Sequence, residues 1–216
     1  MIPAVHPRRV APAAALALMA AVFVAACSGG AASPAPPTGE TTGAATGACP
    51  TSQPAPLPAG ETRTVTIETE EGAIAIRVEA DLSPIAAGNF VALAGCRYYD
   101  GVVFHRVVPG FVIQGGDPTG TGSGGPGSEI QDEPVTAIYG RATVAMARTL
   151  APNSVGSQFF IVLDDGARTS LASANTYQII GTVSSGMDAV DAIAAAADAQ
   201  NPSQPVVMTR VTVANP

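Results

Sequence analysis

Residues 104–117 read FHRVVPGFVIQGGD, and this stretch is the most informative feature of the chain. It places Arg106 and Gln114 among apolar residues, on two adjoining runs with the composition of strands. Arginine and glutamine are seldom buried unless they have a partner or a function. The stretch therefore predicts a pocket for a small molecule or a peptide, with one cation and one amide among apolar side chains.

Short apolar runs on both sides of this stretch predict a mainly β domain. Residues 63–69 and 73–79 alternate apolar with polar or small side chains around a Glu-Glu-Gly turn, which is typical of a β-hairpin. Further runs are bounded by glycine, proline, asparagine and aspartate, and their regular spacing favours a barrel or a sandwich. These further runs cover residues 102–108, 111–114, 142–147, 159–163, 178–183 and 206–213.

Two amphipathic helices are expected between the strands. Ser83 and Pro84 suit the N-cap and the first position of a helix, and Gly95 is placed to end it. A second apolar repeat at helical spacing begins at Met187 and reaches Ala197, directly before the last strand-like run. The chain shows no internal repeat.

The first 26 residues predict a secretory signal peptide. Arg8 and Arg9 precede an uncharged apolar run over residues 10–26, and small residues lead into Cys27. The run is shorter than the roughly 20 residues that a spanning helix needs, and its end is typical of a bacterial lipoprotein signal. We therefore expect residues 1–26 to be removed and Cys27 to carry a lipid. An ordinary cleaved signal or a short anchor helix is the alternative.

Residues 27–61 predict the lipidated cysteine and a flexible tether. Glycine, alanine, serine, threonine and proline dominate this segment, so it cannot offset its ordering entropy by burial. Residues 62–216 are long enough for one domain with its own core. Without Arg8 and Arg9 the chain has 8 arginines, no lysine and 17 acidic residues. This balance argues against nucleic acid and anionic lipid headgroups as partners.

Three blocks of the chain resemble the cyclophilin family of peptidyl-prolyl cis/trans isomerases. They are the FHRVVPGFVIQGGD stretch, AMAR at residues 145–148 and GSQFFI at residues 156–161, and the resemblance extends over residues 63–213. It implies an eight-stranded antiparallel barrel capped by two α-helices. It also implies catalysed rotation about X-Pro peptide bonds, which breaks no covalent bond and uses no cofactor or metal.

The resemblance assigns the catalytic chemistry to Arg106, Phe111 and Gln114. Arg106 matches the catalytic arginine, which contacts the prolyl carbonyl and the region of the rotating nitrogen and stays charged at every relevant pH. Phe111 and Phe160 match the rings that line the proline pocket, and Val112 stands where many members have methionine. Gln114 matches the glutamine that binds substrate backbone and orients the arginine. Taken singly, such residues would more simply be a core arginine paired with an acid and phenylalanines that only pack.

Further positions beside the pocket follow from the same resemblance. Ala147, Arg148 and Gln158 match residues that contact substrate backbone, and the Arg148 position is often arginine in bacterial members. His105 lies at the pocket edge in the family, although a structural histidine is the simpler interpretation because metal-ligand partners of suitable spacing are lacking. The loop around Gly122 fits GxGxxG, but it opens no helix after a strand, so no dinucleotide site is expected. In the family this loop borders a second pocket, for the residue before the X-Pro pair.

The chain departs from eukaryotic cyclophilins between residues 163 and 178. Many of those proteins have a tryptophan there that lines the proline pocket, whereas this chain has no tryptophan and carries extra residues before Tyr177. Leu171 is the candidate for that wall, and Tyr177 is the candidate for the position of the family's pocket histidine.

Cys49 and Cys96 are an even pair once Cys27 carries a lipid. In an oxidising compartment such a pair predicts a disulfide, and an extended segment from Cys49 could reach most of a small barrel. Two free thiols are the alternative.

These features together predict an extracytoplasmic, membrane-anchored lipoprotein that acts as a peptidyl-prolyl isomerase. Its expected partners are proline-containing segments of secreted or envelope proteins and, through the lipid on Cys27, the membrane; a monomer is expected. The alternative is a module that keeps the fold and binds proline peptides, or acts as a chaperone, with little turnover. A hydrolase is a weaker interpretation, because the chain has no GxSxG elbow and only one histidine after the signal.

Overall fold

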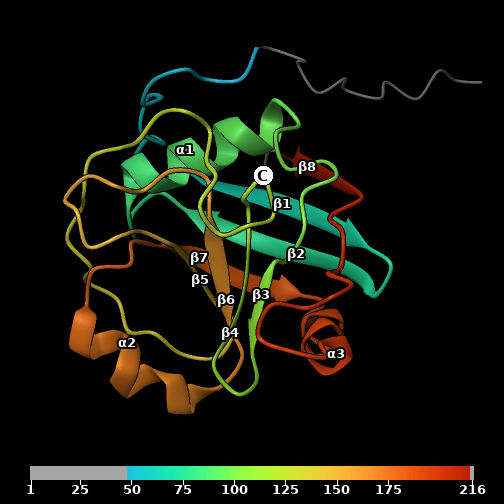
Figure 1. Cartoon of the computed structure of the whole chain (residues 1–216). Coiled ribbons are helices and arrows are strands. Elements are labelled where there is room, and N and C mark those ends of the chain that lie inside the picture. The colour runs from blue at the N-terminus through green and yellow to red at the C-terminus, as the bar shows by residue number, and fades with distance from the viewer. Residues whose placement is uncertain (1–47, 215–216) are drawn as a thin grey trace, which may run out of the picture. The chain divides into compact units, whose positions relative to one another are not determined.

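The computed structural model describes residues 48–214. Eight strands form one antiparallel sheet in the order β3-β4-β6-β5-β7-β2-β1-β8 (Figure 1). The expected mainly β architecture with eight antiparallel strands is therefore confirmed. The strands are β1 (Thr62–Thr69), β2 (Gly72–Glu79), β3 (Arg106–Val108), β4 (Val112–Gly115), β5 (Thr143–Met146), β6 (Phe159–Val162), β7 (Ile179–Ser185) and β8 (Arg210–Ala214).

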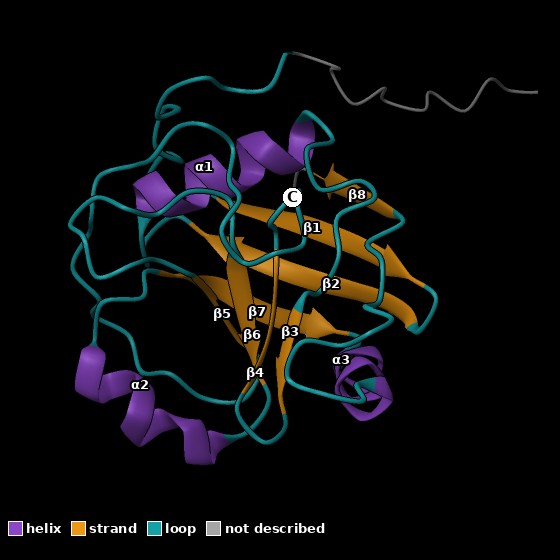
Figure 2. Ribbon diagram, in the orientation of Figure 1, coloured by secondary structure: helices purple, strands orange, loops and turns teal. Residues whose placement is uncertain are grey.

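Three α-helices accompany the sheet within the described residues (Figure 2). Helices α1 (Pro84–Gly95) and α3 (Met187–Ala196) are the two that the sequence predicts. The sequence does not predict helix α2 (Arg168–Ala174), which follows a 3-10 turn at Asp165–Ala167. Its 7 residues complete only about two turns, which is too short for a helical repeat to stand out in the sequence.

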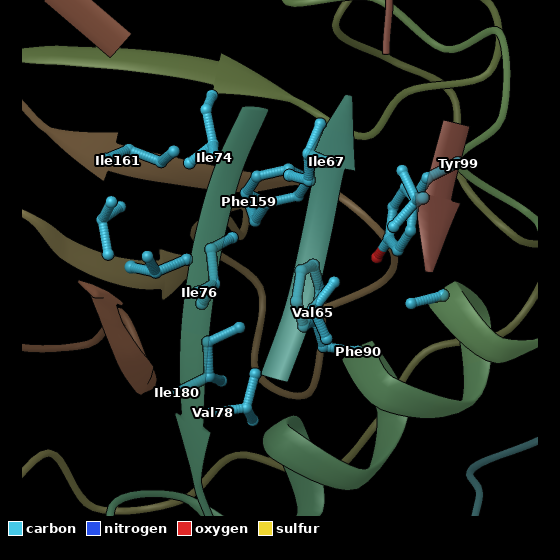
Figure 3. Close-up of a cluster of buried hydrophobic side chains, with 14 of the residues drawn as sticks. Val65, Ile67, Ile74, Ile76, Val78, Phe90, Tyr99, Phe159, Ile161 and Ile180 are labelled. Carbon is cyan, nitrogen blue, oxygen red and sulfur yellow. The ribbon is translucent and has the colours of Figure 1, made fainter. Parts of the chain in front are cut away.

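The main core lies between the sheet and the inner faces of α1 and α3. Alternate residues of the β1–β2 hairpin are fully buried there, as a period of two predicts. Phe90 of α1 packs against Tyr99 and Phe159, with ring centroids 5.4 and 5.1 Å from its own. Figure 3 shows this core and labels Val65, Ile67, Ile74, Ile76, Val78, Phe90, Tyr99, Phe159, Ile161 and Ile180.

A second, smaller apolar cluster includes residues of β4, β5, β6, β7 and α2. Leu171 is the only buried residue of α2, so this helix has a narrow apolar contact with the rest of the domain. The cluster lies beneath the pocket that is described below. Its buried members are Val112, Tyr139, Ala145, Phe160, Val162, Ala167, Leu171 and Ile179.

The N-terminus of α1 is capped differently from the sequence prediction. Pro84 takes the first helical position, but the side chain of Ser83 makes no capping hydrogen bond. Instead, the carboxylate of Glu133 accepts hydrogen bonds from the backbone N–H groups of Ile85 and Ala86, each at 2.9 Å. A negative charge at this end also suits the helix dipole. Ser83 occupies the predicted N-cap position, but its side chain does not cap the helix because a residue distant in the sequence occupies the same donors.

Cys49 and Cys96 lie within bonding distance, with their sulfur atoms 2.09 Å apart and their Cα atoms 5.2 Å apart. Cys96 directly follows the last residue of α1. The start of the described chain is thereby fixed to the C-terminal end of this helix. The expected signal peptide, Cys27 and most of the expected tether lie outside the described residues.

Residues 55–57 pack against α1 rather than lying apart from the domain. Leu57 is buried, and its backbone N–H donates to the carbonyl of Pro84 at 2.9 Å. Gly88, in the middle of α1, permits this approach, because a Cβ atom there would lie 2.4 Å from the carbonyl oxygen of Ala55. Packing therefore begins before residue 62, where the sequence places the start of the domain.

Candidate functional site

The β3–β4 hairpin brings Arg106 and Gln114 face to face. The two residues are direct partners in the antiparallel register, so their side chains share one face of the sheet. Nη1 of Arg106 lies 3.4 Å from Oε1 of Gln114. Within residues 48–214, Arg106 has no carboxylate partner, unlike six other arginines. The interpretation of Arg106 as a core arginine paired with an acid is therefore not supported.

A chain of amide hydrogen bonds orients Gln114. Its Nε2 donates to Oε1 of Gln158 at 2.9 Å, which turns its own Oε1 toward Arg106. Nε2 of Gln158 donates in turn to the carbonyl oxygens of Gly122 and Gly124, at 3.0 and 2.9 Å. The glycine-rich loop thereby fixes both amides, and through them it fixes the acceptor beside the guanidinium.

A pocket of about 200 Å³, lined by both apolar and polar side chains, opens beside Arg106. Phe160 of β6 stands opposite Gln114 in the register, and its ring meets that of Tyr177 edge-on at 5.3 Å. The pocket unites most of the site residues that the sequence predicts and adds Ser170 and Ala174, which it does not. The full lining is Arg106, Phe111, Val112, Gln114, Ala147, Arg148, Phe160, Ser170, Leu171, Ala174 and Tyr177.

A larger, open groove of about 710 Å³ lies on the other side of Gln114. Residues 122–129 and residues 156–158 line it. Gln114, Ala147 and Arg148 line both hollows, so they separate the pocket from the groove. An extended peptide could therefore occupy both hollows by crossing these three residues.

Arg148 is held by its own loop rather than left free. Its Nε donates to the carbonyl of Thr149 at 3.1 Å, and its Nη2 donates to that of Ala151 at 2.7 Å. Its Nη1 lies 2.9 Å from a carboxylate oxygen of Asp132. The resemblance implies substrate contact at this position, but the guanidinium is engaged in holding residues 148–151.

Asp117 organises the glycine-rich loop from a fully buried position. One carboxylate oxygen accepts from the backbone N–H of Thr119 at 2.7 Å; the other accepts from those of Gly122 and Gly124, at 2.6 and 3.0 Å. Burial alone would raise the pKa of Asp117, but the hydrogen bonds from Gly124, Thr119 and Gly122 outweigh it and lower the pKa to about 2. The carboxylate is therefore charged at neutral pH and keeps the loop in shape.

His105 lies under this loop and lines neither hollow. A side chain at Gly122, whose φ is +85°, would lie 3.7 Å from the imidazole ring. Burial lowers the pKa of His105, although the charge of Asp117 opposes this effect. A neutral, structural histidine fits this environment better than a residue at the pocket edge.

No group of three or more His, Cys, Asp or Glu side chains in residues 48–214 is arranged to hold a metal ion. In the same part of the chain, each helix is too short or too polar to cross a membrane.

The fold and the site together define a cyclophilin. Residues 64–213 match the family described as cyclophilin type peptidyl-prolyl cis-trans isomerase/CLD. The chain belongs to this family, as its three sequence blocks predict, and it is an enzyme of the peptidyl-prolyl isomerase class.

Individual relatives agree with this identification. A probable peptidyl-prolyl cis-trans isomerase from Brucella abortus is 37% identical over 154 residues, covering 64% of this chain and 74% of that protein. A putative bifunctional phosphatase/peptidyl-prolyl cis-trans isomerase from Streptococcus pyogenes is 47% identical over 102 residues, which are 45% of this chain but only 22% of that protein. A cyclophilin type isomerase from Cryptosporidium parvum has a crystal structure with a TM-score of 0.63 at 30% identity, covering 72% of this chain and 99% of its own. Its structure in the presence of the dipeptide Ala-Pro gives a TM-score of 0.62.

Proposed function

We propose that this isomerase accelerates rotation about exposed X-Pro bonds of extracytoplasmic proteins and so assists their folding, while a lipid on Cys27 holds it at the membrane. The observation that carries the catalytic part is the Arg106–Gln114 pair at the rim of a pocket of about 200 Å³ that also contains Phe111, Phe160 and Leu171. This pocket has room for a proline ring, and the adjoining groove has room for the preceding residues.

Arg106 would act on the twisted amide. Rotation about a peptide bond has a barrier of about 18 to 20 kcal/mol, because resonance is lost at the perpendicular geometry. The nitrogen then becomes a better hydrogen-bond acceptor, so a fixed cationic donor stabilises the transition state more than the ground state. Arg106 keeps N–H donors for this role, since it makes no ion pair among residues 48–214 and its guanidinium is oriented by Gln114.

Phe111, Phe160 and Leu171 would hold the proline ring. Phe160 and Leu171 are buried in the small cluster beneath the pocket, so this floor is fixed before substrate arrives. Apolar walls of this kind grip the ground state and the transition state alike. The Cryptosporidium relative studied with Ala-Pro supports a proline-containing ligand for the same fold.

The N-terminal sequence supports the proposed location. The basic start, the apolar run and the small residues before Cys27 are typical of a lipoprotein signal. The Cys49–Cys96 pair fits the same location, because disulfides persist in oxidising compartments. Partners, on this proposal, are proline-containing segments of secreted or envelope proteins, and the isomerase acts as a monomer.

The catalytic part is tested by a cis/trans isomerisation assay on an Ala-Pro tetrapeptide, with the full chain purified in mild detergent. We expect the rate of isomerisation to rise in proportion to enzyme concentration. Peptide binding without acceleration would instead favour the proline-binding or chaperone module.

The location is tested by fractionating cells that express the chain or its Cys27→Ser variant. The wild-type chain should partition with membranes, and its N-terminal peptide should carry a lipid on Cys27 by mass spectrometry. The variant should be released or should stay uncleaved. An unmodified N-terminus at any other residue contradicts lipidation.

A further inference from the structure

Helix α2 supplies one wall of the proline pocket but has little stability of its own. Ser170, Leu171 and Ala174 line the pocket from this helix, and Leu171 is its only buried residue. The helix has 7 residues and no side-chain N-cap, whereas isolated helices shorter than about 12 to 15 residues are marginal in water. Something outside the helix must therefore hold this wall in place.

Tyr139 contacts both ends of the segment that contains the wall. Its hydroxyl donates to the carbonyl of Tyr177 at 2.9 Å and accepts from the N–H of the same residue at 3.2 Å. Its own carbonyl accepts a hydrogen bond from Nε of Arg168, the first residue of α2, at 3.1 Å. The Tyr139 side chain is almost wholly buried, at 1% exposure. Residue 139 is thus bonded to the residues that begin and follow the helix.

We infer that Tyr139 is a positioning residue of the active site, which clamps residues 168–177 so that Leu171 and Tyr177 form the wall of the proline pocket. The inference rests on the proposed proline-isomerase function of this pocket. Because Tyr177 also packs edge-on against Phe160, fixing Tyr177 helps to fix the floor of the pocket. Burial raises the pKa of Tyr139, so its hydroxyl keeps the proton that it donates at neutral pH.

The clamp should affect binding of the proline ring more than the chemical step. The wall touches the ring in the ground state and in the transition state, and loss of such uniform binding raises KM with little change in kcat. Arg106 and Gln114 lie on the β3–β4 hairpin, which Tyr139 does not hydrogen-bond.

The test is Tyr139→Phe, which removes both hydroxyl hydrogen bonds and keeps the ring. We expect KM for the Ala-Pro tetrapeptide to rise by about 3- to 10-fold and kcat to stay within about twofold. Hydrogen exchange should quicken at the amide of Tyr177 and across residues 168–177, and it should stay unchanged in β1 and β2.

Tyr99→Phe is the matched control. Tyr99 is also 1% exposed, and its hydroxyl donates to the carbonyl of Ser157 at 2.9 Å, away from the proline pocket. This variant also loses a buried tyrosine hydroxyl, but KM and exchange over residues 168–177 should stay at wild-type values. Should Tyr139→Phe not fold, Arg168→Ala loosens the same segment from a side chain that is 54% exposed, with an expected rise in KM of about twofold.

The outcomes separate the two proposals. If wild-type protein neither binds nor isomerises the peptide, the proposed function fails and the clamp fails with it. If wild-type protein is active while the Tyr139→Phe or Arg168→Ala variant keeps both wild-type KM and wild-type exchange over residues 168–177, the clamp alone is overturned. A fall in kcat at unchanged KM also overturns it.

Discussion

At the scale of single residues, Arg106 should separate catalysis from folding. Arg106→Ala should lower kcat/KM by about 10² to 10³, since a donor that acts mainly in the transition state is worth about 3 to 4 kcal/mol. The melting temperature should change little, because Arg106 makes no ion pair within residues 48–214. Arg97→Ala is the control: it breaks the exposed Arg97–Asp100 pair and should leave kcat/KM unchanged. An unchanged kcat/KM in Arg106→Ala would remove this residue from the mechanism.

Asp117 makes the stability of the domain depend on pH, and its lowered pKa gives the direction of that dependence. Its folded-state pKa of about 2 lies below the value of about 3.9 in an unfolded chain. The stability that it contributes is therefore fully present above about pH 4 and is lost as the pH falls toward 2. Asp117→Asn should lower the free energy of unfolding at pH 7 by about 1 to 3 kcal/mol.

Denaturant titrations of both proteins from pH 7 to pH 2 test this. The difference in unfolding free energy between wild type and Asp117→Asn should become smaller between pH 4 and pH 2, because Asp117 is protonated there and loses its charge. A gap that stays constant over this range would show that the carboxylate charge does not hold the loop.

The sequence predicts which residues line the pocket, but it predicts less well which contacts those residues make. Arg106 and Gln114 lie in one short motif, so the hairpin that joins them already specifies their proximity, whereas Phe160 lies in a second motif that only the resemblance to cyclophilins places at the same pocket. The Arg148–Asp132 pair joins two loops, and neither residue stands in a motif that points to the other. Hence substrate contact was expected at Arg148, and its engagement within the loop was not.

At the scale of elements, α1 offers a paired test of close packing. Alanine normally stabilises a helix interior by up to about 1 kcal/mol relative to glycine. Gly88→Ala should instead destabilise the domain, because the new Cβ would lie 2.4 Å from the carbonyl oxygen of Ala55 and 2.9 Å from the backbone nitrogen of Leu57. The loss should be about 1 to 3 kcal/mol of unfolding free energy.

Gly95→Ala is the matched substitution in the same helix. A Cβ at Gly95 meets nothing within 4 Å, so this variant should be as stable as wild type or slightly more so. Thermal unfolding of the two variants under one condition gives the comparison. Equal stability of Gly88→Ala and Gly95→Ala would show that residues 55–57 do not press on α1.

The elements that the sequence predicts are those with a visible period. The β1–β2 hairpin and helices α1 and α3 each extend over 8 residues or more, which lets the alternation or the helical repeat stand out. Helix α2 is shorter and lies in the part of the chain that departs from the eukaryotic pattern. The Glu133 cap on α1 was missed for another reason, since capping rules inspect neighbours in the chain and this partner is remote.

At the scale of the whole molecule, the Cys49–Cys96 bond should contribute to stability and not to catalysis. It would close a loop of 47 residues, worth about 4 kcal/mol in the chain-entropy model and less after the cost of ordering the segment around Cys49. Both cysteines lie outside the lining of the pocket and the groove. The Cys49→Ser/Cys96→Ser double variant should therefore unfold more easily and keep wild-type kcat/KM.

Intact-mass analysis of the unreduced protein should show two hydrogens fewer than the reduced form. Two thiols that react freely with a maleimide before reduction would contradict the bond. Equal unfolding free energies for wild type and the double variant would contradict its contribution to stability.

The four tyrosines of this chain fall into two pairs, and there is no tryptophan. Tyr99 lies in the main core and meets Tyr98 edge-on at 5.4 Å, whereas Tyr139 and Tyr177 are hydrogen-bonded at the wall of the pocket. Near-ultraviolet emission from the protein is therefore tyrosine emission alone, and half of its emitters stand beside the place where a proline ring would bind. Occupancy of the pocket should thus alter the intrinsic fluorescence, so an optical titration can follow ligand binding without an introduced label.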